Sequence, residues 1–275
     1  MAKSTIVIYH GNCPDGFGAA FACWQLNKKR FTYHPGIHNQ QPPRFMHKKL
    51  IFLDFCYTPD IMQRLLDDGN EIIVLDHHKT AQDRMKSIKH RRLIKNFDMT
   101  HSGAVMSWMY FNDNWDDSKV PLFFKYIEDR DLWNFKLENS NEFNLGLMSY
   151  KYDFEIWNEL FKRDVETIAA EGKLSNTKFK KDIDELLGIP GMIIEREIGG
   201  HKVPTINLPY LYASEVGHIL SKDKKFAAVY YETSEGYIYS LRSQADGGMD
   251  VAKIAEKYGG GGHKNASGFT VKEKL

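Results

Sequence analysis

The length, charge and cysteine content of the chain exclude several classes of protein. The sequence has 275 residues and a formal net charge of +1, with 37 Lys and Arg against 36 Asp and Glu. This length suggests two domains, each able to bury a core of its own. The balanced charge excludes a global basic surface for bulk nucleic-acid binding, so any contact with nucleic acid should be small and local.

The cysteines and the apolar runs indicate a protein of the reducing cytosol. Cys13, Cys23 and Cys56 are widely spaced and form no CxxC pair, so we expect neither a disulfide framework nor a zinc ribbon. No stretch approaches the run of about 18 apolar residues that a membrane span needs, and the chain begins with a predicted strand rather than a signal sequence. We therefore expect a cytoplasmic, unexported protein with no membrane partner.

The first half of the chain alternates predicted strands and helices, which indicates an α/β domain with a parallel sheet and helices on both faces. Short apolar runs predict strands over 4–9, 50–53, 71–75 and 91–95. Apolar residues at helical spacing predict helices over 16–28, from Thr58-Pro59 to Gly69, over 102–111 and over 120–127.

Polar side chains that can bind a metal follow three of these strands. His10 and Asp15 bracket the loop after the first strand, Asp54 ends the second, and Asp76-His77-His78 ends the third. The carboxyl ends of parallel strands meet at one edge of a sheet, where ligands bind, so we expect these side chains to converge. An isolated Asp-His-His could equally hydrogen-bond a loop. Metal-binding side chains at the ends of three strands, however, favour a site.

The middle of the chain is rich in charge. Glu128-Asp129-Arg130-Asp131 is expected just past the last turn of the helix over 120–127, where a charge run is usually a solvated helix end. Helices are predicted over 153–171 and 175–187, with breaks at Gly172 and over 188–191. The predicted domains are residues 1–150 and 191–275, joined by a helical linker over 151–190.

The last part of the chain predicts a small α+β domain. It contains two predicted hairpins, over 192–208 and 226–242, and helices over 212–221 and from Asp250 to Tyr258. Four glycines, 259–262, precede His263-Lys264 and a final strand over 268–271. Glycine has no side chain to pack, so we expect the four glycines to contribute nothing to the core. Their backbone N–H groups can approach an anion closely, and we therefore interpret the run as a phosphate-binding stretch rather than a flexible linker.

Together these motifs resemble the DHH phosphoesterase superfamily, in the branch with the DHH-associated C-terminal domain. That branch includes RecJ-like exonucleases, nano-RNases and cyclic-dinucleotide phosphodiesterases. The resemblance rests on His10, Asp15-Gly16, Asp54, Asp76-His77-His78, Asp129 and a terminal Gly-Gly-Gly-His-x-x-Ala-x-Gly-Phe. It implies a bilobal protein with two divalent ions at the cleft between the lobes, usually manganese, with magnesium, iron or cobalt as alternatives.

The resemblance also implies a role for each matching residue. Asp54 would bridge both metals, His77 and Asp129 would complete one site, His10 would contribute to the other, and Asp15 would be a further ligand. His78 would contact the scissile phosphate, and Asp76 would orient a ligating imidazole, which makes these two residues and Asp54 the catalytic set. In the second domain, the residues implied to bind substrate are Arg242, Ser243, Gly261, Gly262 and His263.

The first motif departs from the pattern of many relatives, which carry Asp-x-Asp where this chain has Cys13-Pro14-Asp15. Cys13 or Asn12 thus takes the place of a carboxylate. A thiol shifts metal preference away from hard ions, so the second metal should be weaker or of different identity. The other interpretation is that Cys13 only packs in the turn.

The residues and the resemblance predict a phosphodiesterase that uses metal-activated water. The expected substrate is a short single-stranded oligonucleotide or a linear or cyclic dinucleotide, cleaved to mononucleotides. A homodimer is one candidate assembly. The alternatives are an inorganic pyrophosphatase or polyphosphatase, against which the terminal glycine motif speaks, and a nucleotide sensor that has lost catalysis. The sequence leaves open the choice between RNA and DNA and the direction of attack.

Overall fold

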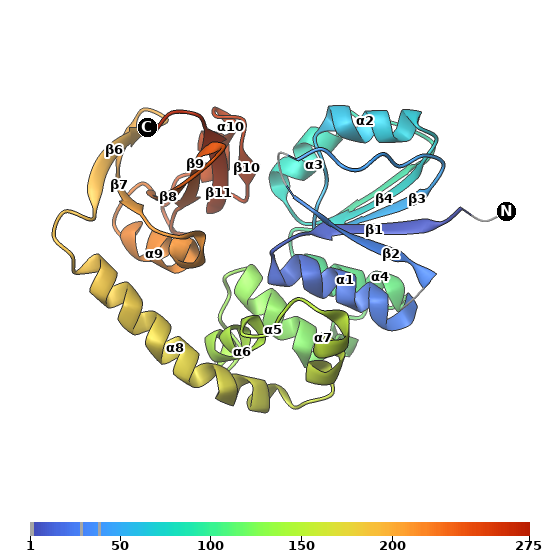
Figure 1. The fold of residues 1–275 in the computed structure, drawn as a ribbon, viewed down its shortest axis with the longest axis horizontal. Helices are drawn as coiled ribbons and strands as arrows, with labels where there is room; N and C mark the ends of the chain where they lie inside the picture. Colours follow the sequence, from blue (N-terminus) through green and yellow to red (C-terminus); the bar gives the residue numbers. More distant parts are fainter. Residues whose placement is uncertain (1–2, 28–29, 38–39) are drawn as a thin grey trace. The chain divides into compact units, whose positions relative to one another are not determined.

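The structure is a computed structural model that describes residues 3–27, 30–37 and 40–275 (Figure 1). The chain divides into two compact units, residues 1–177 and 178–275. The point of division lies inside helix α8 (Val165–Leu187), in the segment predicted as a helical linker. The predicted fold class is confirmed: a parallel sheet with helices, a helical middle and a mixed C-terminal sheet. In the described ranges, no helix has the length and apolarity needed to cross a bilayer.

Five parallel strands form the sheet of the N-terminal unit, in the order β2-β1-β3-β4-β5. Their bounds are β1 Thr5–His10, β2 Thr32–Gly36, β3 Lys49–Leu53, β4 Glu71–Asp76 and β5 Leu93–Phe97. The sequence predicts all of these strands except β2. That strand, Thr-Tyr-His-Pro-Gly, lies at the sheet edge, where a proline is tolerated and an apolar run is not required.

Helices cover both faces of this sheet, as predicted (Figure 1). Helices α2 (Pro59–Asp67) and α3 (Lys79–Met85) pack on one face, and α1 (Pro14–Asn27) and α4 (Gly103–Phe111) on the other. Residue 28, predicted as the end of α1, lies outside the described residues. Alternate residues of β3 and β4 face the two layers, with Phe52 and Val74 toward α2 and Leu53 and Leu75 toward α1. This two-sided burial explains why these strands have continuous apolar runs.

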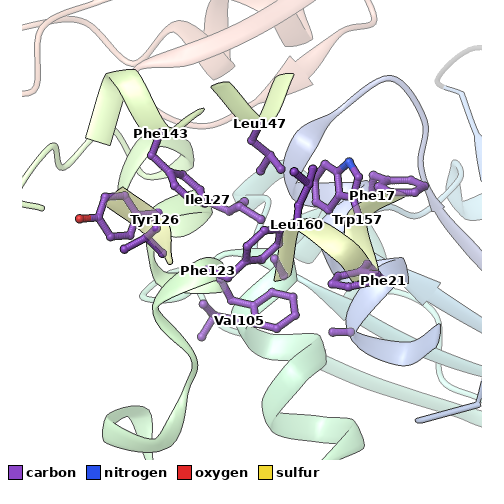
Figure 2. Packing of buried hydrophobic residues seen from close by; sticks show 14 of the residues in the cluster. Phe17, Phe21, Val105, Phe123, Tyr126, Ile127, Phe143, Leu147, Trp157 and Leu160 are labelled. Atoms are coloured by element: carbon purple, nitrogen blue, oxygen red, sulfur yellow. The ribbon is translucent and has the colours of Figure 1, made fainter. Parts of the chain in front are cut away.

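A second core of the N-terminal unit lies among helices (Figure 2). Helices α5 (Leu122–Asp131), α6 (Ser140–Met148) and α7 (Phe154–Phe161) pack against α1 and α4. Figure 2 shows the aromatic part of this core, which includes Phe17 and Phe21 from α1, Phe123 from α5 and Trp157 from α7. These large buried rings fix α1 and α5 against each other, and both helices carry acidic residues at their ends.

Three helix boundaries differ from the prediction. Residues 128–131 form the last turn of α5 rather than a segment beyond it, and Glu128 and Asp129 are buried in spite of their charge. The predicted helix over 153–171 is two helices, α7 and α8. Gly172 lies inside α8 and does not break it. A Cβ at this position would lie 1.8 Å from the backbone oxygen of Glu142. The glycine is needed where α8 crosses α6 closely.

The C-terminal unit contains a mixed sheet in the order β10-β11-β9-β8-β7-β6. The strands are β6 Ile194–Ile198, β7 His201–Asn207, β8 Ala227–Thr233, β9 Gly236–Arg242, β10 Gly261–Gly262 and β11 Ala266–Val271. Both predicted hairpins are confirmed. Helices α9 (Ala213–Leu220) and α10 (Val251–Glu256) pack against this sheet. A short 3-10 helix occurs at Tyr210–Tyr212, and another occurs in the N-terminal unit at Asp117–Lys119. The carboxylate of Asp250 caps α10, as predicted.

The glycine run before β11 does have packing value, so that part of the sequence interpretation is wrong. A Cβ at Gly260 would lie 2.0 Å from the backbone oxygen of Gly268, and one at Gly262 would lie 2.5 Å from that of Ala266. Gly262 also has a φ of +142°, which residues with a Cβ rarely adopt. Two of the four glycines are therefore required for the close pairing of β10 with β11.

Candidate metal centre

Metal-binding side chains from three neighbouring strands meet at one edge of the N-terminal sheet. His10 ends β1, Asp54 follows β3, and Asp76 ends β4 with His77 and His78 directly after it. Strand β3 pairs in parallel with both β1 and β4, so the three carboxyl ends lie side by side. The convergence predicted from the sequence is therefore observed.

Asp54 lies at the centre of this group, and its two carboxylate oxygens face different side chains. Oδ1 is 3.0 Å from Nε2 of His77 and 3.7 Å from Nδ1 of His78. Oδ2 is 3.3 Å from Nδ1 of His10 and 3.8 Å from Sγ of Cys13. The Asp54 side chain is only 1% exposed. A carboxylate with ligand atoms on both sides has the geometry to bridge two cations.

The backbone around Asp54 is unusual in two ways. Asp54 has a φ of +56°, in the left-handed region that residues other than glycine seldom adopt and that is often found at functional sites. Glycines also stand where helix ends approach the strands: a Cβ at Gly103 would lie 2.4 Å from the Cβ of Asp54, and one at Gly16 would lie 2.3 Å from the oxygen of His10. These glycines allow the first turns of α4 and α1 to reach the site.

Three carboxylates surround Nε2 of His77. The distances from this atom are 3.0 Å to Oδ1 of Asp54, 3.4 Å to Oδ2 of Asp131 and 3.6 Å to Oδ2 of Asp15. Asp15 also accepts hydrogen bonds of 2.6 and 3.0 Å from the first two backbone N–H groups of α4. The positive end of that helix stabilises the Asp15 carboxylate.

Burial and the crowding of acids shift the pKa values of this cluster. Burial, and then the charges of Asp131 and Asp54, raise the pKa of Asp15 well above its usual value. Burial opposes the ionisation of Asp54, but hydrogen bonds from His10 and His77 outweigh it and hold the Asp54 pKa well below its usual value. Burial also lowers the pKa of His77, but the contact with Asp54 and the charges of its other acidic neighbours raise it well above the ordinary value. These directions reflect an excess of buried acidic groups, a setting that favours added positive charge.

The residues present fit divalent cations. Oδ2 of Asp131 is buried, and among the described residues it accepts no hydrogen bond. A buried carboxylate oxygen without a partner costs free energy, and a bound cation would supply that partner. Carboxylate and imidazole ligands suit manganese, iron, zinc or magnesium. Three of the sets of side chains whose ligand atoms lie within 4.8 Å of one another belong wholly to this sheet edge and the helix ends beside it: His10, Cys13 and Asp54; Asp15, His77 and Asp131; and Asp54, Asp76 and His78.

Asp76 fixes the two histidines that follow it. Its Oδ1 accepts hydrogen bonds from the backbone N–H of His77 at 2.7 Å and of His78 at 3.1 Å. The same oxygen lies 2.8 Å from Nδ1 of His78. A carboxylate in this position orients an imidazole and selects its tautomer.

Asp129, which the sequence interpretation selected as a ligand, has its carboxylate engaged elsewhere. Oδ1 accepts the backbone N–H of Lys136 at 2.9 Å, and Oδ2 accepts that of Leu137 at 3.1 Å. These bonds hold the loop that follows α5. Asp131 is the acid of this run that faces His77. Positions two apart lie on different faces of a helix, so Asp129 and Asp131 point in different directions. The predicted helix ended at residue 127, and the sequence therefore did not indicate which of the two acids faces the site.

Arg242, predicted to bind substrate, lies at the end of β9 in the C-terminal unit. Its guanidinium donates to Oγ of Ser214 at 2.9 Å and to the backbone oxygen of Leu241 at 2.8 Å. Burial lowers the pKa of Arg242 to about 10, with a smaller opposing effect from Glu215, so the side chain keeps its charge at neutral pH. A partly buried cation that uses two of five possible donors among the described residues can bind an anion.

The other predicted substrate-binding residues lie close to Arg242 in the sheet. Gly261 and Gly262 form β10, and the backbone N–H of His263 donates to Ala266 at 2.8 Å. Strand β11 pairs with both β10 and β9. The Ser243 hydroxyl donates to the backbone oxygen of Met249 at 2.7 Å, which holds it within the fold.

Comparison with known proteins identifies the C-terminal domain. Residues 212–275 match the model of the DHHA1 domain. The C-terminal unit therefore contains a DHHA1 domain, the DHH-associated domain that the terminal glycine motif resembles. An uncharacterized protein of Acanthamoeba polyphaga mimivirus, R106, is 30% identical over 292 aligned positions, which cover 96% of this chain and 66% of that protein. This chain thus spans slightly less than two thirds of that relative's length.

Solved structures resemble the fold of this chain. An exopolyphosphatase-related protein from Bacteroides fragilis aligns with a TM-score of 0.57 at 16% identity and covers 99% of this chain and 88% of its own. The pGpG-specific phosphodiesterase PggH from Vibrio cholerae aligns with a TM-score of 0.49 at 12% identity, covering 98% of this chain and 94% of its own. At these identities, the first alignment supports the fold alone.

Proposed function

We propose that this protein is a metal-dependent phosphodiesterase of the DHH superfamily that hydrolyses short single-stranded oligonucleotides or linear or cyclic dinucleotides to mononucleotides. The observation that carries the proposal is the position of Asp54, whose two oxygens face separate sets of ligand atoms. A bridging carboxylate holds two cations roughly 3.5 to 4 Å apart, as in two-metal phosphoesterases. The DHHA1 domain over residues 212–275 supports the same reaction class.

Within this proposal each side chain has a separate task. Asp54 would hold both ions, His77, Asp15 and Asp131 would hold one of them, and His10 would hold the other. Bound divalent ions, with manganese as the first candidate, supply Lewis acidity and a hydroxide formed from water near neutral pH. These five residues would hold that chemistry in a largely pre-formed set of ligands, of which Asp15, Asp54 and His77 are buried and His10 and Asp131 are partly exposed.

His78 and Asp76 are proposed to act on the substrate rather than on the metals. His78 contacts the scissile phosphate, to which an imidazole N–H donates a hydrogen bond. Asp76 keeps the ring in place through its 2.8 Å contact with Nδ1. Since Asp76 also accepts two backbone N–H groups, its own position is fixed by the chain that follows β4.

The function is tested with a panel of substrates. We expect cleavage of 5′-labelled dinucleotides and trinucleotides with Mn²⁺, faster than cleavage of long single strands, and loss of activity when EDTA removes the metal. The near-neutral chain offers little basic surface for a long strand. RNA, DNA, cyclic dinucleotides, pyrophosphate and polyphosphate are compared by product analysis. Hydrolysis of pyrophosphate or polyphosphate alone would support the polyphosphatase alternative, and no hydrolysis by metal-loaded protein would indicate a sensor.

We further propose that Arg242, Gly261, Gly262 and His263 bind the nucleotide. A guanidinium presents a planar fork to a phosphate, and glycine amides approach it without a Cβ in between. We expect Arg242→Met, which keeps the length of the stem, to lower kcat/KM on a dinucleotide by about 10- to 150-fold, the equivalent of about 1.5 to 3 kcal/mol for hydrogen bonds to a charged group. His263→Ala should have an effect in the same direction.

The control for this prediction is the substrate itself. Activity on bis-p-nitrophenyl phosphate, which has no nucleotide to bind, should change little in either variant. Arg196→Met changes another partly buried arginine of the same sheet and should leave dinucleotide kinetics near wild type. Equal losses on both substrates would show that Arg242 acts through stability or catalysis and not through nucleotide binding.

A further inference from the structure

A sulfur atom lies among the ligand atoms on one side of Asp54. Sγ of Cys13 is 3.8 Å from Oδ2 of Asp54, and Nδ1 of His10 is 3.3 Å from the same oxygen. The sulfur, nitrogen and oxygen atoms all lie within 4.8 Å of one another. One cation can therefore contact all three.

The local structure directs Cys13 to this position. Its backbone oxygen accepts the N–H of Phe17 at 2.9 Å, so Cys13 is the first residue of the turn that starts α1, a helix of 14 residues. The preceding Asn12 has a φ of +58°, which turns the chain sharply after β1. Cys13 is partly exposed, whereas Cys23 and Cys56 are buried.

We propose that Cys13 is a metal ligand and that, with His10 and Asp54, it forms a site that selects a thiophilic divalent ion such as zinc, iron, cobalt or cadmium over manganese. The inference rests on the proposed function only in taking the cluster to bind metal. When the metal–sulfur bond forms, the thiol proton is released to solvent. Soft sulfur ligands favour softer ions, while carboxylates favour harder ones.

This assignment makes the two metal positions chemically different. The other position is formed by Asp15, His77 and Asp131 with Asp54, and its ligand atoms are nitrogen and oxygen. A harder ion such as Mn²⁺ suits that position, and a softer ion suits the one beside Cys13. The chain is then built for a mixed pair of metals that share Asp54.

The test is spectroscopic and needs no substrate. Metal-free full-length protein is titrated with Co²⁺, bound cobalt is counted by elemental analysis, and the near-ultraviolet absorption is followed. A thiolate bound to Co²⁺ gives a charge-transfer band there. We expect the band in the wild type, its loss in Cys13→Ser, and its retention in the matched variants Cys23→Ser and Cys56→Ser.

The outcomes separate this proposal from the proposed function. Cobalt binding without a band in the wild type, or with a band that survives in Cys13→Ser, would overturn the thiolate ligand and leave the metal centre intact. No cobalt binding at all would count against both. Cys13→Asp provides a second measurement: the ratio of Cd²⁺ affinity to Mn²⁺ affinity should fall by at least about tenfold. Residues that only hydrogen-bond to a metal ligand already change metal affinity by about that factor, and a direct ligand should matter no less. An unchanged ratio would assign Cys13 to packing.

Discussion

Asp54→Asn is expected to lower kcat by at least about a thousandfold, which corresponds to about 4 kcal/mol of lost transition-state stabilisation. An amide has the shape of a carboxylate but offers one neutral oxygen as a ligand, so it cannot bridge two cations. Oδ1 and Oδ2 of Asp54 now face His77 and His10 respectively, and one of these contacts would lose its acceptor. Retention of more than about a tenth of the wild-type rate would rule out the bridging role.

The fold should survive this substitution, which makes the loss of activity interpretable. Asparagine is one of the few residues that tolerate the left-handed backbone conformation found at Asp54. Thermal unfolding should show a stable, cooperative protein, and metal analysis should show less bound metal than in the wild type. A matched control is Asp98→Asn, because Asp98 follows β5 and its carboxylate accepts from Thr100 rather than from the cluster. This variant should keep most of the activity.

The convergence of the site could be predicted because strand ends are specified locally. Apolar runs define β1, β3 and β4, and a parallel sheet brings their carboxyl ends together whatever the loops do. His10, Asp54 and Asp76 therefore needed no tertiary information to be placed near one another. The edge strand β2 was not predictable in this way, since its sequence lacks an apolar run.

The acidic run at the end of α5 could not be interpreted from the sequence for a different reason. Sequence patterns indicate burial through apolar residues, yet Glu128 and Asp129 are buried because distant backbone groups satisfy their charges. Glu128 accepts the N–H of Ser102 at 2.9 Å, and Asp129 accepts that of Lys136. These donors lie 26 and 7 residues away in the chain. The pairing of an acid with such donors becomes visible only in the folded structure.

The two acids of this run give opposite predictions, although they are two positions apart. Asp131→Asn should lower kcat by at least about a hundredfold and reduce bound metal, because it removes an anionic ligand atom 3.4 Å from His77. Asp129→Asn should instead lower the free energy of unfolding by about 1 to 3 kcal/mol, because an amide NH₂ would oppose one of the two backbone N–H donors that the carboxylate accepts.

Each variant serves as the control for the other, since both replace an acid at the end of α5 by its isosteric amide. Activity and metal content at a temperature where both proteins are folded identify the ligand, and urea unfolding measures the cost to stability. If Asp129→Asn lost its metal and its activity while Asp131→Asn kept both, Asp129 would be the ligand that the family resemblance implies. The contacts of Asp129 with Lys136 and Leu137 would then have to give way when the cation binds.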